Sequence, residues 1–509
     1  MKKIVWQKAR RISQLFFAGL FVYLLFASVE QREAPALADI FFRLDPLTAI
    51  SEWLSAKAWE PRAGLAILTI LLTVFFGRIW CGWICPMGTL LEWTPLRSAR
   101  EWSKRIHPGW RGVKYGLLFI ILGAALLENL SLLVLDPLAL LTRFSTTAFI
   151  PGLNLAITSI ERLIVRVEVF RPAIEALEKF WRGTLLPTLQ PSFDQGFWIA
   201  LIFMGIIGLN ALADRFWCRY LCPLGGLLGL LSRFSIFRLI ITKGCTRCRM
   251  CSSACKLDAI EQAEDGFKIM SSECTMCLDC INRCPHDLIG LRFALQPARP
   301  QPFDPGRRKV LQSAAIGAVG ALMLRTDTRN RETHAWLLRP PGAQDENVFL
   351  SKCLRCSECM KICPTSALQP SLTQAGLEGL WTPVMKPRVG YCDFGCHACG
   401  QICPSQAIPL LSLEEKRTQV IGKASVDRNR CLPWASNTPC IVCEEMCPLP
   451  EKAIYLDEIS IKGAEGEDLV LQRPYVNRDL CIGCGICEHH CPLESTAAIR
   501  VYNRSLPMK

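Results

Sequence analysis

The sequence predicts an α-helical membrane domain joined to small, cysteine-rich α+β domains. Three observations predict this class. Half of the 509 residues are hydrophobic, several apolar runs are long, and most of the 28 cysteines occur in closely spaced groups of four. An ordinary soluble enzyme has neither the long apolar runs nor so many cysteines, and a small disulfide scaffold is far shorter.

Four apolar runs, each about 20 residues long, predict transmembrane helices. They cover residues 12–29, 63–80, 115–135 and 197–217. Each is expected to be helical, because lipid satisfies no backbone hydrogen bonds. Four buried core helices are the alternative, which the length of the runs and their lack of charge disfavour.

Basic residues predict the orientation of these helices. Some precede the first run and others lie between the second and third, and both groups are expected to face the cytoplasm. The first group is Lys2, Lys3, Lys8, Arg10 and Arg11, and the second is Arg97, Arg100, Lys104, Arg105, Arg111 and Lys114. The formal charge of +13 is thus explained by membrane topology. No stretch interleaves basic and aromatic residues as in nucleic-acid binding.

The membrane part reads as a tandem repeat. "GRIWCGWICPMG" at 77–88 matches "DRFWCRYLCPLGG" at 214–226, and "RLDPL" at 43–47 matches "VLDPL" at 134–138. Each copy would consist of a helix, an outer LDPL turn, a second helix and an inner cysteine pair. The second copy carries an insertion, 149–192, that predicts an amphipathic helix on the outer surface.

Composition divides the chain into four parts. Residues 1–240 form the membrane domain, and 241–294 form a first cysteine-rich domain on the cytoplasmic side. Residues 295–345 form a linker with the proline-rich stretch "LQPARPQPFDPG" and the segment "RRKVLQSAAIGAVGALML". Residues 346–509 form the second cysteine-rich domain.

Six quartets contain 24 of the cysteines, and the four that remain belong to the repeated membrane motif. The first domain has Cys245, Cys248, Cys251, Cys255 and Cys274, Cys277, Cys280, Cys284. The second has Cys353, Cys356, Cys359, Cys363; Cys392, Cys396, Cys399, Cys403; Cys431, Cys440, Cys443, Cys447; and Cys481, Cys484, Cys487, Cys491. The membrane motif has Cys81, Cys85, Cys218 and Cys222.

Gaps of two, two and three residues followed by proline are the run of bacterial ferredoxins, in which three thiolates bind one [4Fe–4S] cluster and the fourth reaches the neighbouring cluster. The sequence therefore predicts six [4Fe–4S] clusters in bacterial-ferredoxin-type domains. In the first domain Cys284 should join the first three cysteines, and Cys255 should join the second three. The pairing in the second domain does not follow from spacing.

Other uses of these cysteines are disfavoured. Zinc sites need only paired CxxC knuckles, and disulfides need Cα separations that such crowded runs rarely offer. The stretch "CDFGCH" also reads as a variant haem site with His397 as the ligand, although C-x-x-C-H is the usual spacing and a complete quartet already uses both cysteines.

The membrane cysteines suggest a seventh metal site. On a helix, Cys81 and Cys85 share a face, as do Cys218 and Cys222. If the repeats pack about a pseudo-twofold axis, the four sulfurs converge at the inner membrane surface. A cluster, thiol or copper chemistry, and plain helix-end packing all stay open as explanations.

Two acidic residues, Asp45 and Asp136, belong to the repeated outer turns. A quinol releases protons together with electrons, so its site needs a carboxylate or a histidine beside an apolar slot. Both aspartates are therefore candidate catalytic acids on the quinol side. Helix capping after a proline-bearing turn is the other interpretation.

The segment "GRRKVLQS" with its Ala/Gly-rich apolar run resembles an internal twin-arginine export signal, which would place the C-terminal domain in the periplasm. A short fifth membrane helix is another reading of the run. The alternative is a buried or surface helix after which the chain stays cytoplasmic.

Residues 1 to about 290, with paired WCxxxCPxG motifs and two ferredoxin runs, resemble the NapH-type membrane quinol dehydrogenases. Residues from about 307 resemble the MauM/NapG-type ferredoxins, including the quartet "CLPWASNTPCIVCEEMCPLPEKAI". The chain looks like a fusion of the two. The resemblance implies quinol oxidation, with electrons passed to a periplasmic cytochrome or terminal reductase.

The sequence therefore predicts a multi-pass protein of the bacterial inner membrane. Its expected function is electron exchange between the quinone pool and a partner redox enzyme or cytochrome through [4Fe–4S] clusters, with quinol as exchangeable substrate and with lipid, but no nucleic acid, as a partner. Two alternatives stay open: a copper-reducing or assembly factor of the CcoG type, and a quinone-reducing subunit fed by a catalytic partner.

Overall fold

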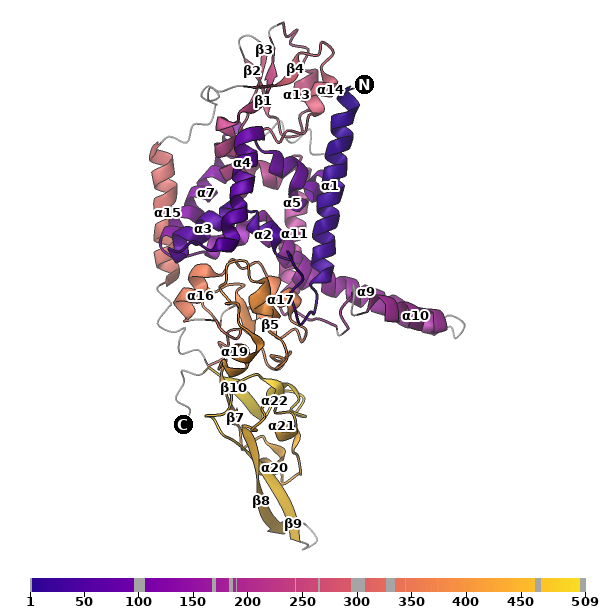
Figure 1. Ribbon diagram of the computed structural model, residues 1–509, viewed down its shortest axis with the longest axis vertical. Coiled ribbons are helices and arrows are strands. Elements are labelled where there is room, and N and C mark those ends of the chain that lie inside the picture. Colours follow the sequence, from indigo (N-terminus) through magenta and orange to yellow (C-terminus); the bar gives the residue numbers. More distant parts are fainter. Residues whose placement is uncertain are drawn as a thin grey trace. The chain divides into compact units, whose positions relative to one another are not determined.

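The computed structural model describes residues 2–95, 106–166, 171–182, 186–188, 190–242, 244–263, 266–293, 307–325, 335–343, 345–372, 374–462 and 468–503. The basic residues at 97, 100, 104 and 105 and the proline-rich stretch 295–306 lie outside them. The chain forms two compact units (Figure 1). Unit 1 comprises Met1–Leu25, Asp39–Ser145 and Phe197–Met323, and unit 2 comprises Phe26–Ala38, Thr146–Gly196 and Leu324–Lys509.

Unit 1 contains the apolar helices and the first cysteine-rich segment. Its helices are α1 (Lys2–Ala27), α2 (Ile40–Arg43), α3 (Pro46–Ala56), α4 (Ala66–Phe76), α5 (Pro86–Trp93), α7 (Val113–Leu126), α8 (Pro137–Phe144), α11 (Gly196–Gly208), α12 (Pro223–Leu231), α13 (Met250–Ala254), α14 (Asp279–Arg283) and α15 (Arg307–Arg325). Its strands β1 (Phe237–Ile241) and β4 (Ile289–Phe293) pair antiparallel, as do β2 (Ile260–Ala263) and β3 (Gly266–Ile269).

Three helices among the described residues are long and apolar enough to cross a membrane, which indicates membrane association. They are Trp6–Ala27, Gly109–Leu126 and Pro137–Val165. The first two fall on predicted spans, whereas the third was predicted as part of an outer turn and an insertion. The other two predicted spans correspond to the shorter apolar helices Pro61–Phe76 and Gly196–Ala211. The count of four spans and the tandem repeat stay predictions.

Each of the two shorter helices ends where its backbone leaves the α-helical conformation. Helix α4 stops at Gly77, whose φ of +73° is accessible to glycine at little cost. Helix α11 passes into a 3-10 turn at Leu209–Ala211. Each break leads into a π-helical turn that carries the cysteine motif, Trp80–Ile84 in one case and Trp217–Leu221 in the other.

Helix α15 packs closely against α7 (Figure 1). A Cβ atom added to Gly123 would lie 2.2 Å from the carbonyl oxygen of Ala314, and one added to Gly317 would lie 2.0 Å from that of Ile120. Small residues at such contacts let two helix backbones approach, as is common between membrane helices. The apolar run that resembles an export signal is therefore a helix packed within unit 1.

Unit 2 contains the second cysteine-rich segment and a helical hairpin. Its helices are α9 (Ile150–Val165), α10 (Arg171–Trp181), α16 (Glu346–Lys352), α17 (Glu358–Ile362), α18 (Ala398–Ile402), α19 (Leu413–Thr418), α20 (Leu432–Ala435), α21 (Val442–Glu445) and α22 (Ile486–His489). Its antiparallel strand pairs are β5 (Leu368–Pro370) with β6 (Pro383–Met385), β7 (Lys423–Val426) with β10 (Ile499–Tyr502), and β8 (Ile454–Lys462) with β9 (Asp468–Val476).

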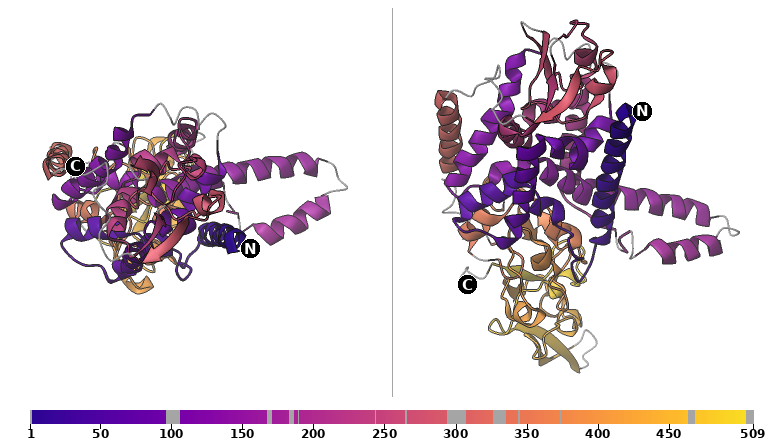
Figure 2. Two further views of the ribbon diagram at one scale, coloured as in Figure 1. Left: turned by 90° about the horizontal axis from the view of Figure 1, so that it is seen from above. Right: turned by 45° about the horizontal axis from the view of Figure 1, so that its top comes forward.

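The predicted amphipathic helix of the insertion is α9, and α10 returns beside it (Figure 2). Glu161 joins the two helices, because it accepts a hydrogen bond from Trp181 Nε1 at 3.1 Å and pairs with Arg182 at 2.5 Å. Elsewhere in unit 2, many buried cysteines share one hydrophobic core with the aliphatic residues of the short helices and strands.

Candidate functional site

The cysteine loops have an unusual backbone. In four of the six quartets, the residue before and the residue after the second cysteine have positive φ values, between 53° and 83°. These residues are Arg247 and Arg249, Met276 and Leu278, Arg355 and Ser357, and Gly483 and Gly485. Left-handed residues turn successive N–H groups inward and form an anion-binding concavity of the kind found at iron–sulfur sites. Six of the eight are not glycine, so their surroundings must hold this costly conformation.

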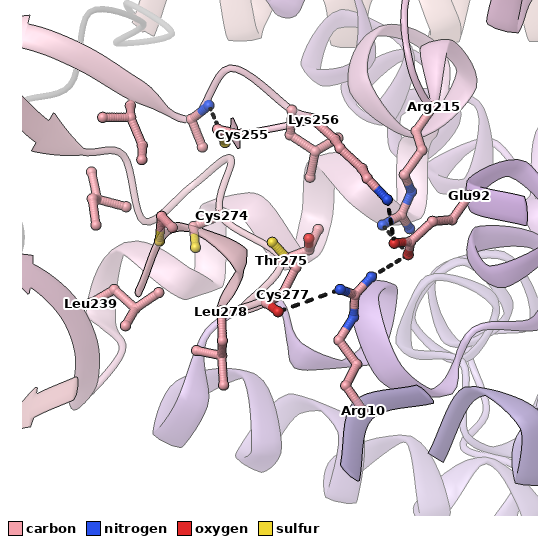
Figure 3. A pocket seen from close by; sticks show the side chains of 15 residues that line it. Arg10, Glu92, Arg215, Leu239, Cys255, Lys256, Cys274, Thr275, Cys277 and Leu278 are labelled. Carbon is pink, nitrogen blue, oxygen red and sulfur yellow. Dashed lines mark hydrogen bonds and ion pairs between the residues drawn. The ribbon is translucent and has the colours of Figure 1, made fainter. Parts of the chain in front are cut away.

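The first cysteine-rich segment forms a cavity from both of its motifs. Cys274, Cys277 and Cys280 line it together with Cys255, the last cysteine of the preceding motif (Figure 3). The backbone N–H of Ala259 donates to Cys255 Sγ at 3.2 Å. This is the crossed arrangement that the sequence predicts, with three ligands from one run and the fourth from the other. We call these four cysteines set 2, and Cys245, Cys248, Cys251 and Cys284 set 1.

The second cysteine-rich segment repeats the crossed arrangement. One cavity is lined by Cys363 with Cys392, Cys396 and Cys399, which are set 4, and another by Cys491 with Cys431, Cys440 and Cys443, which are set 5. We assign the remaining cysteines to two further sets, because Cys403 lies near Cys359 and Cys447 lies near Cys484. Burial raises the pKa of the Cys359 thiol, and its neighbours Cys356, Cys353 and Cys403 raise it further. These four form set 3, and Cys447, Cys481, Cys484 and Cys487 form set 6.

Sets 4 and 6 are in direct contact. The backbone N–H of Cys392 donates a hydrogen bond to the carbonyl oxygen of Cys484 at 2.8 Å. Burial raises the pKa of the Cys484 thiol to about 12, and the nearby Cys392 contributes to that increase. The two halves of the second domain are therefore joined through residues that belong to two different sets.

Burial raises the pKa of many of these thiols, and it raises the pKa of Cys274 and Cys277 to about 12. Metal ligands must be deprotonated, so metal binding at such sites releases protons. Among the described residues, no three of the Cys, His, Asp and Glu side chains gather closely enough to hold a single metal ion. Sets 2, 4 and 5 line cavities, which suits a cluster of several iron atoms. The haem interpretation finds little support, because Nδ1 and Nε2 of His397 are hydrogen-bonded to Leu411 and Gln401.

The four membrane cysteines come together, but the two cysteines of each pair do not lie on one α-helix, although the sequence predicts one helix for each pair. Cys81 and Cys218 lie in the π-helical turns, and Cys85 and Cys222 follow these turns as N-caps of α5 and α12. The thiols of Cys85 and Cys222 accept hydrogen bonds from Gly88 N at 3.4 Å and Gly225 N at 3.2 Å. Burial raises the pKa of Cys222, and Cys218, Cys81 and Cys85 raise it further. We call these four cysteines the membrane set.

Two buried arginines cross between the halves of the membrane set. Arg215, from the second motif, donates to the carbonyl oxygen of Cys81 at 2.6 Å. Arg78, from the first motif, places its Nη2 2.9 Å from the Cβ position at Gly225. Each arginine thus contacts the motif of the other repeat. The two positive charges favour an anionic group between the four thiols.

The membrane set touches the first cysteine-rich segment. A Cβ atom on Gly82 would lie 2.2 Å from the carbonyl oxygen of Thr275, and Trp83 Nε1 donates to the carbonyl oxygen of Met276 at 2.9 Å. Gly82 and Trp83 lie between Cys81 and Cys85 in the chain, and the two acceptors lie between ligands of set 2. The turn of one set therefore packs directly on the loop of the other.

Comparisons with known proteins agree with these sites. A family described as "4Fe-4S binding domain" matches residues 63–105 and 195–242, and one described as "4Fe-4S dicluster domain" matches residues 438–495. The chain is 34% identical over 214 residues to the methylamine utilization ferredoxin-type protein MauM of Methylorubrum extorquens, which covers 40% of this chain and 93% of that protein. It is 36% identical over 220 residues to the ferredoxin-type protein NapG of Escherichia coli, covering 41% and 89%. The chain belongs to the MauM/NapG family of ferredoxin-type proteins.

This ferredoxin-type protein is therefore an iron–sulfur electron-transfer protein with 4Fe-4S domains. No solved structure matches it. The first family matches both segments that carry the membrane cysteines, which connects those segments with cluster binding. The likeness of the membrane part to NapH-type proteins rests on its motifs.

The predicted quinol-side acids lie together in unit 1. Asp45 Oδ1 accepts from Leu47 N at 2.8 Å, and Asp136 Oδ1 accepts from Leu138 N at 2.9 Å, so both cap the helices that follow. Both side chains are fully buried. Burial raises the pKa of Asp45 well above its ordinary value, and the neighbouring carboxylate of Asp136 raises it further. Both aspartates therefore cap helices, and their two carboxyl groups also face each other.

A buried ion cluster beside set 2 was missed by the sequence analysis. Glu92 pairs with Lys256 at 3.0 Å, with Arg215 at 3.7 Å and with Arg10 (Figure 3). Gln14 Nε2 also donates a hydrogen bond to Glu92 at 2.9 Å. Burial alone would raise the pKa of Glu92, but Arg215, Arg10 and Lys256 lower it to about 2. The carboxylate therefore stays ionised and holds three cations beside the cysteines.

One signal in the sequence pointed to this cluster. Arg10 and Gln14 are four residues apart within the candidate membrane span Trp6–Ala27, and polar residues on one face of a membrane helix usually have a partner. Their partner, Glu92, is far along the chain and only the fold identifies it.

Proposed function

We propose that this protein is a membrane-bound electron-transfer subunit that exchanges electrons between the quinone pool and a partner redox enzyme or cytochrome, with quinol oxidation as the favoured direction. The crossed cysteine sets are the observation that carries the proposal. A cavity lined by three cysteines of one run and the last of another is the ligand arrangement of paired [4Fe–4S] clusters.

Sets 1 to 6 would hold six [4Fe–4S] clusters, and each cluster supplies one-electron transfer when bound. The protein would position them and tune their potentials through burial and through hydrogen bonds to sulfur. The backbone N–H groups of Ala424 and Ala498 already donate to Cys481 Sγ and Cys491 Sγ, both at 3.4 Å. The contact between Cys392 and Cys484 supports a continuous path through the second domain.

The membrane set would hold a seventh cluster. Its four buried thiols, the arginines Arg78 and Arg215, and the family match over both segments support this role. The contact of Gly82 with Thr275 supports electron exchange between the membrane set and set 2.

The second domain is proposed to lie in the periplasm and the first in the cytoplasm of a bacterial cell, across the inner membrane. Helix α15 connects them in the chain. Its apolar part, residues 310–324, extends about 22 Å at about 1.5 Å per residue, which is short against the ~30 Å of a hydrocarbon core, so export through the twin-arginine-like segment is the favoured route. Its side chains Leu311, Ile316 and Leu322 are exposed and apolar. The domain limits 1–240, 241–294, 295–345 and 346–509 belong to this proposal.

A reduction experiment tests the function. The full chain, purified without oxygen and placed in lipid nanodiscs, is mixed with a menaquinol or ubiquinol analogue, and bleaching of the iron–sulfur absorbance is followed. We expect quinol to reduce the clusters in the wild type. A Cys392→Ser variant should keep reduction of sets 1 and 2 but lose set 4. Copper binding without iron, or clusters that no quinol reduces, would overturn the proposal.

A further inference from the structure

Unit 1 contains a cavity that the cysteine sets do not explain. It lies between helix α1, the end of α5 and the first cysteine-rich segment, and it measures about 840 Å³ when its open mouth is included. Gln7, Gln14 and Leu15 of α1 line it, together with Trp93 of α5 and Lys256 and Asp279 of the cysteine-rich segment.

The walls of the cavity are polar, and most of their charges are paired; the exposed side chain of Arg11 lines the cavity as well. Gln7 Nε2 donates to Asp279 Oδ1 at 3.0 Å, and Lys256 Nζ lies 3.0 Å from Glu92 Oε1. Both glutamines also carry amide oxygens that accept hydrogen bonds. Three cations, Arg10, Arg11 and Lys256, and two carboxylates, Glu92 and Asp279, line the cavity, so an anionic headgroup is the competing occupant. A neutral ring that bears hydroxyl or carbonyl groups matches the mixture of donors and acceptors.

Part of the exposed lining of the cavity is apolar. Leu15 is 60% exposed and Trp93 is 50% exposed, and Ile12 and Phe16 beside them on α1 are exposed as well. These residues of α1 belong to the candidate membrane span Trp6–Ala27. A ligand with a long apolar tail could therefore place its tail along α1 while its headgroup occupies the polar interior.

The cavity adjoins set 2. Arg10, Glu92 and Lys256 line both this cavity and the one that contains Cys255, Cys274, Cys277 and Cys280. Arg10 Nη1 also donates to the carbonyl oxygen of Cys277 at 3.4 Å. A layer of side chains thus separates the two spaces.

We propose that this cavity binds the headgroup of a quinol or quinone, with the isoprenoid tail on the lipid-facing side of α1. The inference rests on the proposed function, because it identifies where the quinone pool is engaged. It differs from the sequence-based prediction, which assigned the quinol side to Asp45 and Asp136.

Binding of decylubiquinone, a short-tailed quinone, to the full chain in nanodiscs tests the site directly. We expect Leu15→Trp, which fills the mouth, to weaken equilibrium binding by about tenfold or more, the equivalent of about 1.4 kcal/mol. Phe16→Trp is the matched control, since Phe16 is 63% exposed and does not line the cavity. It should leave binding unchanged, and both variants should keep the iron content of the wild type.

A photoreactive azidoquinone gives a second measurement on the unaltered protein, so the proposal stays testable if Leu15→Trp fails to fold. Label recovered on peptides that contain Gln7 to Leu15 or Trp93 supports the site. Label confined to the segments around Asp45 and Asp136, or equal binding by both variants, would overturn it. Anionic phospholipid bound in place of quinone would also overturn it, by showing a lipid site.

The outcomes separate this inference from the proposed function. If quinol reduces the clusters but Leu15→Trp changes neither binding nor reduction, the cavity is not the site and the function stands. If the quinone binds at α1 but no electrons reach the clusters, the cavity is the site and the proposed function is wrong.

Discussion

Replacing Glu92 by glutamine should destabilise unit 1 strongly. The side chain of Glu92 is 8% exposed and contacts Arg10, Arg215 and Lys256. Its pKa falls from 4.5 to about 2 in the fold. At about 1.4 kcal/mol per pKa unit, this corresponds to about 3 kcal/mol of unfolding free energy. The figure agrees with the roughly 3–5 kcal/mol lost when one partner of a buried ion pair is removed.

Thermal unfolding of the full chain in detergent measures the effect. A loss of about 3 kcal/mol should lower the midpoint by about 6–12 °C in a unit of this size. The pH dependence follows from the lowered pKa, because the contribution of a carboxylate is complete above its unfolded pKa and is lost as the pH falls through the folded one. The difference between wild type and Glu92→Gln should be full at pH 7 and shrink below about pH 4.5 towards pH 2.

Glu128→Gln provides the matched control. Glu128 pairs with Lys57 at 2.6 Å, but both side chains are exposed to solvent. Exposed pairs contribute about 0–1 kcal/mol, so this variant should unfold almost as the wild type does. A Glu92→Gln midpoint within the range of Glu128→Gln, or a difference that does not change with pH, would refute the reasoning.

Three further predictions concern the cysteine sets and the acid pair. Cys255→Ser should remove the cluster of set 2, although Cys255 belongs to the preceding motif, and iron analysis should show about four fewer atoms per chain. Asp45→Asn keeps an oxygen for the helix cap and removes one of the two facing carboxyl groups. Because the fold raises the pKa of Asp45, ionisation of this carboxyl group destabilises the folded state, and the destabilisation grows as the pH rises. The variant should therefore unfold at a higher temperature than the wild type at pH 8 and lose that advantage near pH 4, as calorimetry would show. Gly82→Ala should cost about 1–3 kcal/mol of stability through overpacking against Thr275, measured by chemical unfolding.

The sequence predicted the cysteine chemistry more fully than the membrane helices. The crossed use of Cys255 follows from the ferredoxin spacing, and in the structure Cys255 lines one cavity with Cys274, Cys277 and Cys280. In the second domain, Cys363 joins the cysteines of the fourth quartet and Cys403 joins those of the third. Spacing did not predict this swap, because the fourth and fifth quartets have longer first gaps and only the fold brings these cysteines near each other.

Backbone breaks and distant ion pairs account for most of what was missed. Hydropathy alone does not register that Gly77 takes a φ of +73° and ends α4, so the predicted span at 63–80 was too long. Glu92 is 82 residues from Arg10 in the chain. A periodic pattern within one helix carries no information about such a pair.

Iron and acid-labile sulfide analysis of the anaerobically purified full chain tests the central claim most directly. Six crossed sets predict about 24 iron atoms per chain, and the membrane set raises this to about 28, of which about four should be lost in a Cys81→Ser, Cys218→Ser double variant. A colourless protein with only a few iron atoms would contradict the account. So would a wild type that holds about 28 iron atoms if the double variant holds the same number.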